Sequence, residues 1–133
     1  LAKINYRIHT DAIKAHLIPT ELPKEKINFV YATEADLLNV ALFGMTAKEW
    51  RDANSGKKGN IRDYAIVEQL VVLSNLESIN AMLIHKGLNQ SERIVELNRI
   101  AITQMKSLIA AADTQKRLTD ASTEHTAGKE NRE

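Results

Sequence analysis

The sequence predicts an all-α fold, a compact bundle of five or six helices around one long central helix, with no β-sheet. Only five glycines and two prolines occur in 133 residues, which leaves little room for the turns of a β-protein. The stretch Ile61–Lys86 contains neither residue type and carries apolar side chains at the helical period. Breaks rich in Gly, Pro and Asn divide the remaining sequence into segments of helical length.

The central segment Ile61–Lys86 has apolar residues on two sides of a helical wheel. One side carries Ile61, Tyr64, Ala65, Val72, Leu76, Ile79, Met82 and Leu83, and the opposite side carries Ile66, Leu70, Leu73 and Ile84. A surface helix has one apolar stripe, so other helices are expected to cover this one on both sides. Asn60 with Asp63 predicts a cap at its start, and Gly87 followed by Leu88 predicts a Schellman stop.

The first predicted helix is Leu1–Ile18, which ends before Pro19 because a residue preceding proline is disfavoured in the α region. A break at Thr10 is an alternative, since this residue can cap a second segment. Because the sequence opens inside a helical pattern without Met, it is expected to be a fragment of a longer protein.

Two shorter helices are predicted next, Lys24–Ala32 and Glu34–Phe43, with Thr33 as the cap that separates them. Gly44 is expected to end the second of these helices.

The next predicted helix is short and carries Trp50, the only tryptophan of the chain. Thr46 and Glu49 have the T-x-x-E spacing of a capping box at its start. The following Ser55–Gly59, of sequence SGKKG, reads as an exposed loop. It lacks the spacing of a phosphate-binding loop.

Asn89 and Glu92 predict the cap of a final helix, Gln90–Ala112. After it, one large aliphatic residue, Leu118, occurs up to the end of the chain. A segment with so little apolar area cannot offset the entropy of ordering it. The predicted organisation is a helical domain over 1–112 and a frayed helix end with a disordered tail over 113–133.

Composition narrows the function classes. Eighteen Lys and Arg against seventeen Asp and Glu give a net charge of +1, so nucleic-acid binding would need a local basic patch. The absence of cysteine excludes thiolate metal sites and fits a cytoplasmic protein. No stretch is apolar enough to span a membrane. No catalytic, metal or cofactor motif is present, so the chain is expected to be no enzyme and to bind no cofactor or small-molecule ligand.

One local basic patch follows a helical corner. Residues 39–53, NVALFGMTAKEWRDA, have the outline of a helix-turn-helix, in which the second helix enters the major groove. The candidate nucleic-acid residues at this corner, spanning 39–62, are Lys48, Arg51, Lys57, Lys58 and Arg62. Glu49 and Asp52 lie on the same short helix, so its charge is mixed.

Glu68 interrupts the main apolar face of the central segment, between Ala65 and Val72, and Asn75 lies two turns further on. A buried carboxylate is costly unless it is paired and hydrogen-bonded. Glu68 and Asn75 are therefore the candidate buried polar residues, with a structural ion pair from a neighbouring helix as the favoured role. A catalytic acid of raised pKa is the alternative.

Long stretches of the chain resemble the C-terminal region of bacterial and phage KilA-N domain proteins. They are LAKINYRIHTDAIKAHLIPTEL, FVYATEADLLNVALFGMTAKEWRDAN, GNIRDYAIVEQLVVLSNLESINAMLI and RIAITQMKSLI. The resemblance covers roughly residues 1–109. It implies a helical accessory domain of a phage-related protein that binds DNA through an upstream KilA-N domain absent from this chain.

The predicted function is therefore non-enzymatic: self-association or partner binding that arranges upstream DNA-binding modules. A homo-oligomer is expected, because dimerisation enlarges the site of a small DNA-binding module. The second apolar face of the first helix, Tyr6, Ile13 and Leu17, has no obvious partner within the chain and is the candidate interface. The alternative is direct nucleic-acid binding at the basic corner.

Overall fold

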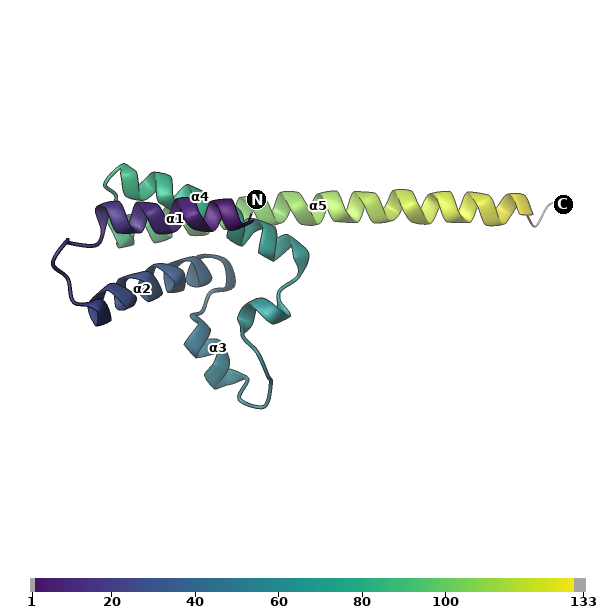
Figure 1. Ribbon diagram of the computed structural model, residues 1–133. Helices are drawn as coiled ribbons and strands as arrows, with labels where there is room; N and C mark the ends of the chain where they lie inside the picture. The colour runs from purple at the N-terminus through teal and green to yellow at the C-terminus, as the bar shows by residue number, and fades with distance from the viewer. Residues whose placement is uncertain (1, 131–133) are drawn as a thin grey trace.

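The computed structural model describes residues 2–130, with side chains described to residue 121, and this part of the chain is helical without any strand. The elements are α1 (Ala2–His16), α2 (Lys24–Phe43), α3 (Ala47–Ala53), the 3₁₀ helix η1 (Ile61–Tyr64), α4 (Val67–His85) and α5 (Gln90–Glu130). Helices α1, α2, α4 and the first part of α5 form a body, and the rest of α5 projects from it as an arm (Figure 1). The predicted all-α fold is confirmed.

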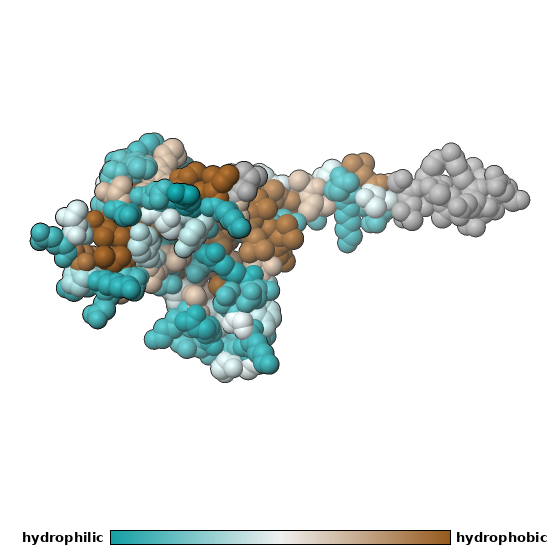
Figure 2. All heavy atoms as spheres, in the orientation of Figure 1, coloured by the Kyte–Doolittle hydropathy of each residue, from teal (hydrophilic) through white to brown (hydrophobic). Residues whose placement is uncertain are grey.

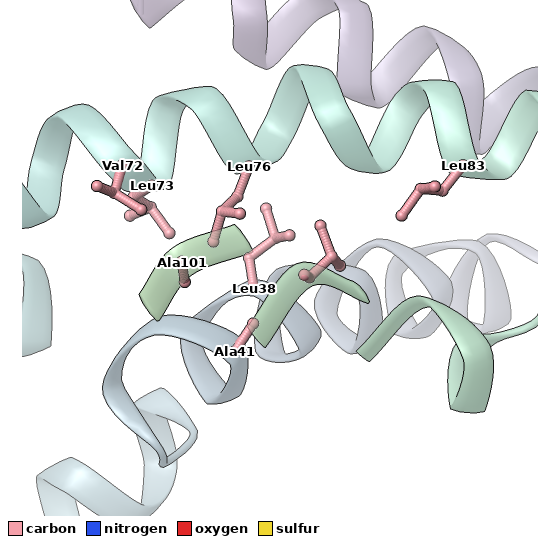
Figure 3. Close-up of a cluster of buried hydrophobic side chains, with 8 residues drawn as sticks. Leu38, Ala41, Val72, Leu73, Leu76, Leu83 and Ala101 are labelled. Atoms are coloured by element: carbon pink, nitrogen blue, oxygen red, sulfur yellow. The ribbon is translucent and has the colours of Figure 1, made fainter. Parts of the chain in front are cut away.

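The apolar core lies on two sides of α4, as expected, but the predicted faces are only partly right. One cluster joins α2, α4 and α5 and contains Leu38, Ala41, Val72, Leu73, Leu76, Leu83, Leu97 and Ala101 (Figure 3). The other joins α1 to α4 through Ala12, Ile13, Ala81 and Ile84. Of the predicted second face, Ile84 packs toward α1, Leu73 belongs to the first cluster, and Ile66 and Leu70 are exposed. Met82 of the predicted first face is exposed too. Leu76 is 0% exposed, so its truncation to Ala is expected to cost about 2–5 kcal/mol.

Capping groups fix the helix ends that the sequence predicts. Thr46 and Glu49 exchange the two hydrogen bonds of a capping box at the start of α3. Asn89 and Glu92 do the same at the start of α5. Gly44 and Gly87 adopt φ values of 77° and 81°, the left-handed conformation that ends helices at little cost for glycine.

The predicted single helix over 61–86 is interrupted. Asn60 caps η1 as expected, and the carboxylate of Asp63 accepts a hydrogen bond from the backbone N–H of Asn60. The chain is then extended at Ala65 and at Ile66 before α4 begins at Val67. The side chain of Gln69 accepts a hydrogen bond from the backbone N–H of Ile66 and so stabilises this second start. Residues 44–66 therefore form an excursion from the body that contains α3 and η1 (Figure 1).

Two other predicted boundaries are wrong. The helices predicted over 24–32 and 34–43 are one helix, α2, because the hydroxyl of Thr33 donates to the carbonyl of Phe29 inside the helix and caps nothing. The alternative break at Thr10 is absent too, since α1 runs through it and its hydroxyl donates back to Arg7.

Helix α5 continues to Glu130, so the predicted helix end at Ala112 is also wrong. Residues 109–121 are all exposed, which agrees with the small apolar area of this segment. The last three residues of the predicted tail, 131–133, lie outside the described part. Within the described part, no helix is long and apolar enough to cross a membrane.

Candidate functional site

A buried polar network joins the four helices of the body. Its centre is the ion pair of Glu34 on α2 with Arg93 on α5, whose side chains are 0% and 2% exposed. Asn80 on α4 lies beside the pair: its amide nitrogen donates to Glu34 Oε1 at 3.2 Å, and its oxygen accepts from Arg93 Nη1 at 3.0 Å. Gln90 donates to the other oxygen of Glu34 at 2.7 Å.

His9 extends this network to α1. The same Asn80 amide nitrogen lies 2.8 Å from His9 Nε2, and because an amide nitrogen only donates, the ring nitrogen must accept. The ring is therefore neutral. Burial, followed by the positive charges of Arg93 and Arg62, lowers the pKa of His9 to about 4, against the opposing effect of Glu34.

The carboxyl group of Glu34 is held ionised. Burial by itself raises its pKa, but the hydrogen bonds from Arg93, Gln90 and Asn80 and the charge of Arg93 outweigh burial and leave the pKa lowered. A surface depression of about 400 Å³ overlies Glu34 and Arg93. Since these polar groups already satisfy one another, the network is structural rather than a free ligand site.

This network takes the place of the ion pair predicted at Glu68. Glu68 is partly buried, and among the described residues the ion pairs are Glu34 with Arg93 and Glu96 with Arg99. The prediction for Glu68 is therefore wrong. Asn75 is also only partly buried and donates to Gln104 Oε1 on α5 at 2.9 Å.

A second buried carboxylate went unpredicted. Glu77 is 5% exposed, and its Oε2 has no hydrogen-bond partner within the described part of the chain. Burial raises its pKa, and the charge of Arg62 opposes that rise. It lines a small cavity of about 80 Å³ together with His9 and Arg62, where α1, α2 and α4 meet.

The basic corner does not have helix-turn-helix packing. Its second helix, α3, packs against η1 rather than α2: the Trp50 and Tyr64 rings lie 5.1 Å apart, and Lys57 Nζ lies 5.2 Å above the Tyr64 ring. The five predicted basic residues, Lys48, Arg51, Lys57, Lys58 and Arg62, are all exposed on the excursion. They share a region of surface, but no helix is presented as a recognition helix is in that motif.

The interface predicted on α1 is mostly internal. Ile13 is 1% exposed and belongs to the cluster that joins α1 to α4, and Leu17 packs against that cluster. Tyr6 alone of the three is exposed, at 61%. The predicted face has a partner within the chain because Ala81 and Ile84 of α4 pack against α1.

Exposed apolar residues gather elsewhere, near the base of the arm. The start of α1 and the start of α4 form a groove of about 340 Å³, lined by Ala2, Asn5, Val67, Leu70, Val71, Ser74 and Asn75. Val67 is 72% exposed and Val71 is 43% exposed. Figure 2 shows hydrophobic residues beside α1 and again where the body meets the arm.

The arm continues the buried face of α5. At 100° per residue, the line that packs into the core at Leu97 and Ala101 passes through Gln104, Leu108, Ala111, Ala112, Gln115 and Leu118. The charged residues of this stretch point away from that line: Lys106, Asp113, Lys116, Arg117 and Asp120. A charge-free face that is buried in the body is therefore exposed along the arm.

Comparisons with known proteins assign no family to the chain. No family model, curated protein or solved structure matches it. The resemblance to KilA-N proteins accordingly stays a prediction. Within the described residues, no group of three or more acidic or histidine side chains is arranged to hold a metal ion.

Proposed function

We propose that this chain is a self-association module, in which two copies pair through the charge-free face of the α5 arm. The observation that carries the proposal is the continuity of that face: the line that is buried at Leu97 and Ala101 is exposed beyond Leu108. A single helix in water gains little from its own hydrogen bonds, and apolar packing supplies most helical stability in proteins. A second copy offers the same face as a partner.

The expected interface is small, and its affinity is modest. Fully burying one leucine side chain is worth about 1.5–3 kcal/mol, and each arm supplies one exposed leucine, Leu118, besides the alanines. Association costs at least several kcal/mol of lost translational and rotational freedom. The pairing is therefore expected to be weak, with a Kd of roughly 10⁻⁴–10⁻³ M.

The biological use follows from the predicted resemblance. Pairing two copies would fix the spacing of two attached DNA-binding modules, and half-site spacing on DNA follows the symmetry of a dimer. In this role, the chain itself contributes association rather than base contacts. The exposed cations of the excursion would add a weak, salt-dependent attraction to phosphates.

Light scattering behind a sizing column, over a series of concentrations, tests the pairing. The mass should rise from one chain toward two as the concentration passes the Kd. Leu118→Asp should keep the protein monomeric, because it places a charge in the shared face. The matched control is Ile102→Asp, which makes a similar change on the opposite side of α5, at a residue that is 49% exposed.

Two outcomes would count against the proposal. A monomer at every concentration up to about 1 mM would refute the pairing, since weaker association falls outside the expected range. A monomer that binds duplex DNA at micromolar concentration would favour the basic corner instead. For that corner, a salt slope of about −2 to −3 is expected from two or three phosphate contacts.

A further inference from the structure

We propose that His16 and His85 form a chelating site for one divalent transition-metal ion of the copper or nickel class. The two imidazoles come from the last residues of different helices, α1 and α4. His16 Nε2 lies 2.7 Å from His85 Nδ1, and both residues are exposed, so an ion in solution can reach them. This site is independent of self-association through the arm.

The packing of α1 against α4 holds the pair in place. Three side-chain contacts join the helices at sequence separations of 69, 71 and 69: Asn5 with Ser74, His9 with Asn80, and His16 with His85. Because the separation stays nearly constant, the two helices run parallel and their C-terminal ends lie side by side. Ile13 and Ile84, just before the pair, are buried in the cluster that joins the helices. The backbone that carries both histidines is therefore fixed before an ion binds, which lowers the entropic cost of chelation.

The distance between the two nitrogens suits an ion of tetragonal geometry. Bonds from a first-row metal to imidazole are about 2.0–2.1 Å long, so two nitrogens at a right angle around one ion lie about 2.9 Å apart. A tetrahedral ion would need about 3.3 Å. The observed 2.7 Å is nearer the first value, and the two exposed rings can turn until both lone pairs point at one ion. Tetragonal nitrogen sites are typical of Cu²⁺ and Ni²⁺.

Binding requires a proton to move within one ring. One of the two facing nitrogens carries the proton that is shared between the rings, and the other accepts it. When an ion takes the place of that proton, the donating ring carries its proton on its other nitrogen instead. Both imidazoles then remain neutral, as ligation requires. Water would complete the coordination, since no third acidic or histidine side chain joins the pair within the described residues.

The electrostatic field at the pair favours a cation. Each helix carries a partial negative charge at its C-terminal end, and the parallel packing of α1 and α4 brings two such ends together. Lys14 and Lys86 are the neighbouring cations in the sequence. Both are exposed, so their long side chains can extend into water and away from a bound ion.

Calorimetric titration of the full chain with Cu²⁺ alone tests the site. One ion is expected to bind per chain, more tightly than Ni²⁺ or Zn²⁺. His16→Gln and His85→Gln should each weaken this binding at least about tenfold, since loss of a group that merely orients a ligand already costs about 10–100-fold. The double variant should bind little more weakly than either single variant, because one imidazole alone makes no chelate. The matched control, His125→Gln, removes one imidazole elsewhere in the sequence and should leave the binding unchanged.

Thermal unfolding gives a second measurement. An ion that joins the ends of α1 and α4 binds the folded chain in preference to the unfolded chain, so Cu²⁺ should raise the unfolding midpoint. Both histidines are exposed, so His16→Gln and His85→Gln should fold normally. Neither variant should show the rise in Cu²⁺.

Three outcomes would overturn the site. Equal Cu²⁺ affinity in the unmodified chain and in both single variants would show that the pair is not the ligand. Two ions per chain, with one lost in each single variant, would show that the histidines bind separately. One ion per two chains, with a mass in light scattering that doubles only when Cu²⁺ is added, would place the site between copies.

Discussion

In the body, four helices are joined by hydrogen bonds between side chains that are almost fully buried. The arm, which is the later part of one of these helices, α5, is exposed along residues 109–121. Both regions are helical, but the contacts that stabilise them differ. In the body, the free energy of unfolding depends on each buried charge having a partner. In the arm, the described side chains are exposed, and only the proposed pairing with a second chain would bury any of them. Changes to each region should therefore have different signatures.

The largest expected effect comes from the ion pair in the body. Arg93→Leu should lower the free energy of unfolding by about 3–5 kcal/mol, because it leaves the carboxylate of Glu34 buried without its cation. Urea unfolding at pH 7 measures this. The double variant Glu34→Leu with Arg93→Leu should lose less than Arg93→Leu alone, since no buried charge is then left. A single-variant cost below about 1 kcal/mol would show that the pair matters little.

Acid should weaken the body through His9. Its pKa is about 4 in the folded chain and 6.5 as the ordinary value, so between these values the unfolded chain binds more protons. The contribution of neutral His9 to the free energy of unfolding is therefore fully present above pH 6.5. It is lost as pH falls toward 4, by as much as about 3 kcal/mol.

Urea unfolding between pH 7.5 and 4.5 measures this loss. His9→Gln is the matched variant, because its side-chain oxygen can still accept from Asn80 but does not titrate. The pH dependence of this variant should be flatter than that of the unmodified chain. Identical profiles for the two proteins would mean that His9 does not carry the effect.

The smallest effect on folding is expected from the arm. Deleting residues 113–133 should change the free energy of unfolding by less than about 1 kcal/mol in dilute solution, because the described side chains of this segment are exposed. The same deletion should abolish pairing. Circular dichroism during heating and light scattering on one sample measure both quantities. A large fall in the unfolding midpoint of the monomer would show that the arm also stabilises the body.

Much of the fold could be predicted from the sequence because its helix ends carry local signals. The capping pairs at Thr46, Asn60 and Asn89 and the stop at Gly87 all depend on residues within one turn of each other. The break before Val67 was missed because Ile61 and Tyr64 continue the apolar period of the following helix. Periodicity alone does not reveal two extended residues, Ala65 and Ile66, between two helical segments.

The buried charges could not be assigned by the same means. Glu68 interrupts an apolar line on its own helix, but it lies in the first turn of α4 and is only partly buried there. Glu34 and Arg93 each stand one turn before a buried residue, Leu38 and Leu97. A charged residue one helical turn before a buried apolar residue is a signal that the charge is buried too. Pairing them, however, required contacts 59 residues apart in the sequence, which no local pattern supplies.

This separation has a consequence for synthesis on the ribosome. Chains grow at about 5–20 residues per second, so Glu34 waits roughly 3–12 s before Arg93 is made. During that interval the carboxylate of Glu34 has no cation and should stay in water, which keeps α2 from docking against α4. His9, made earlier still, waits for Asn80 in the same way. The body of this chain should therefore close late and in one step, after the first turn of α5 has been synthesised.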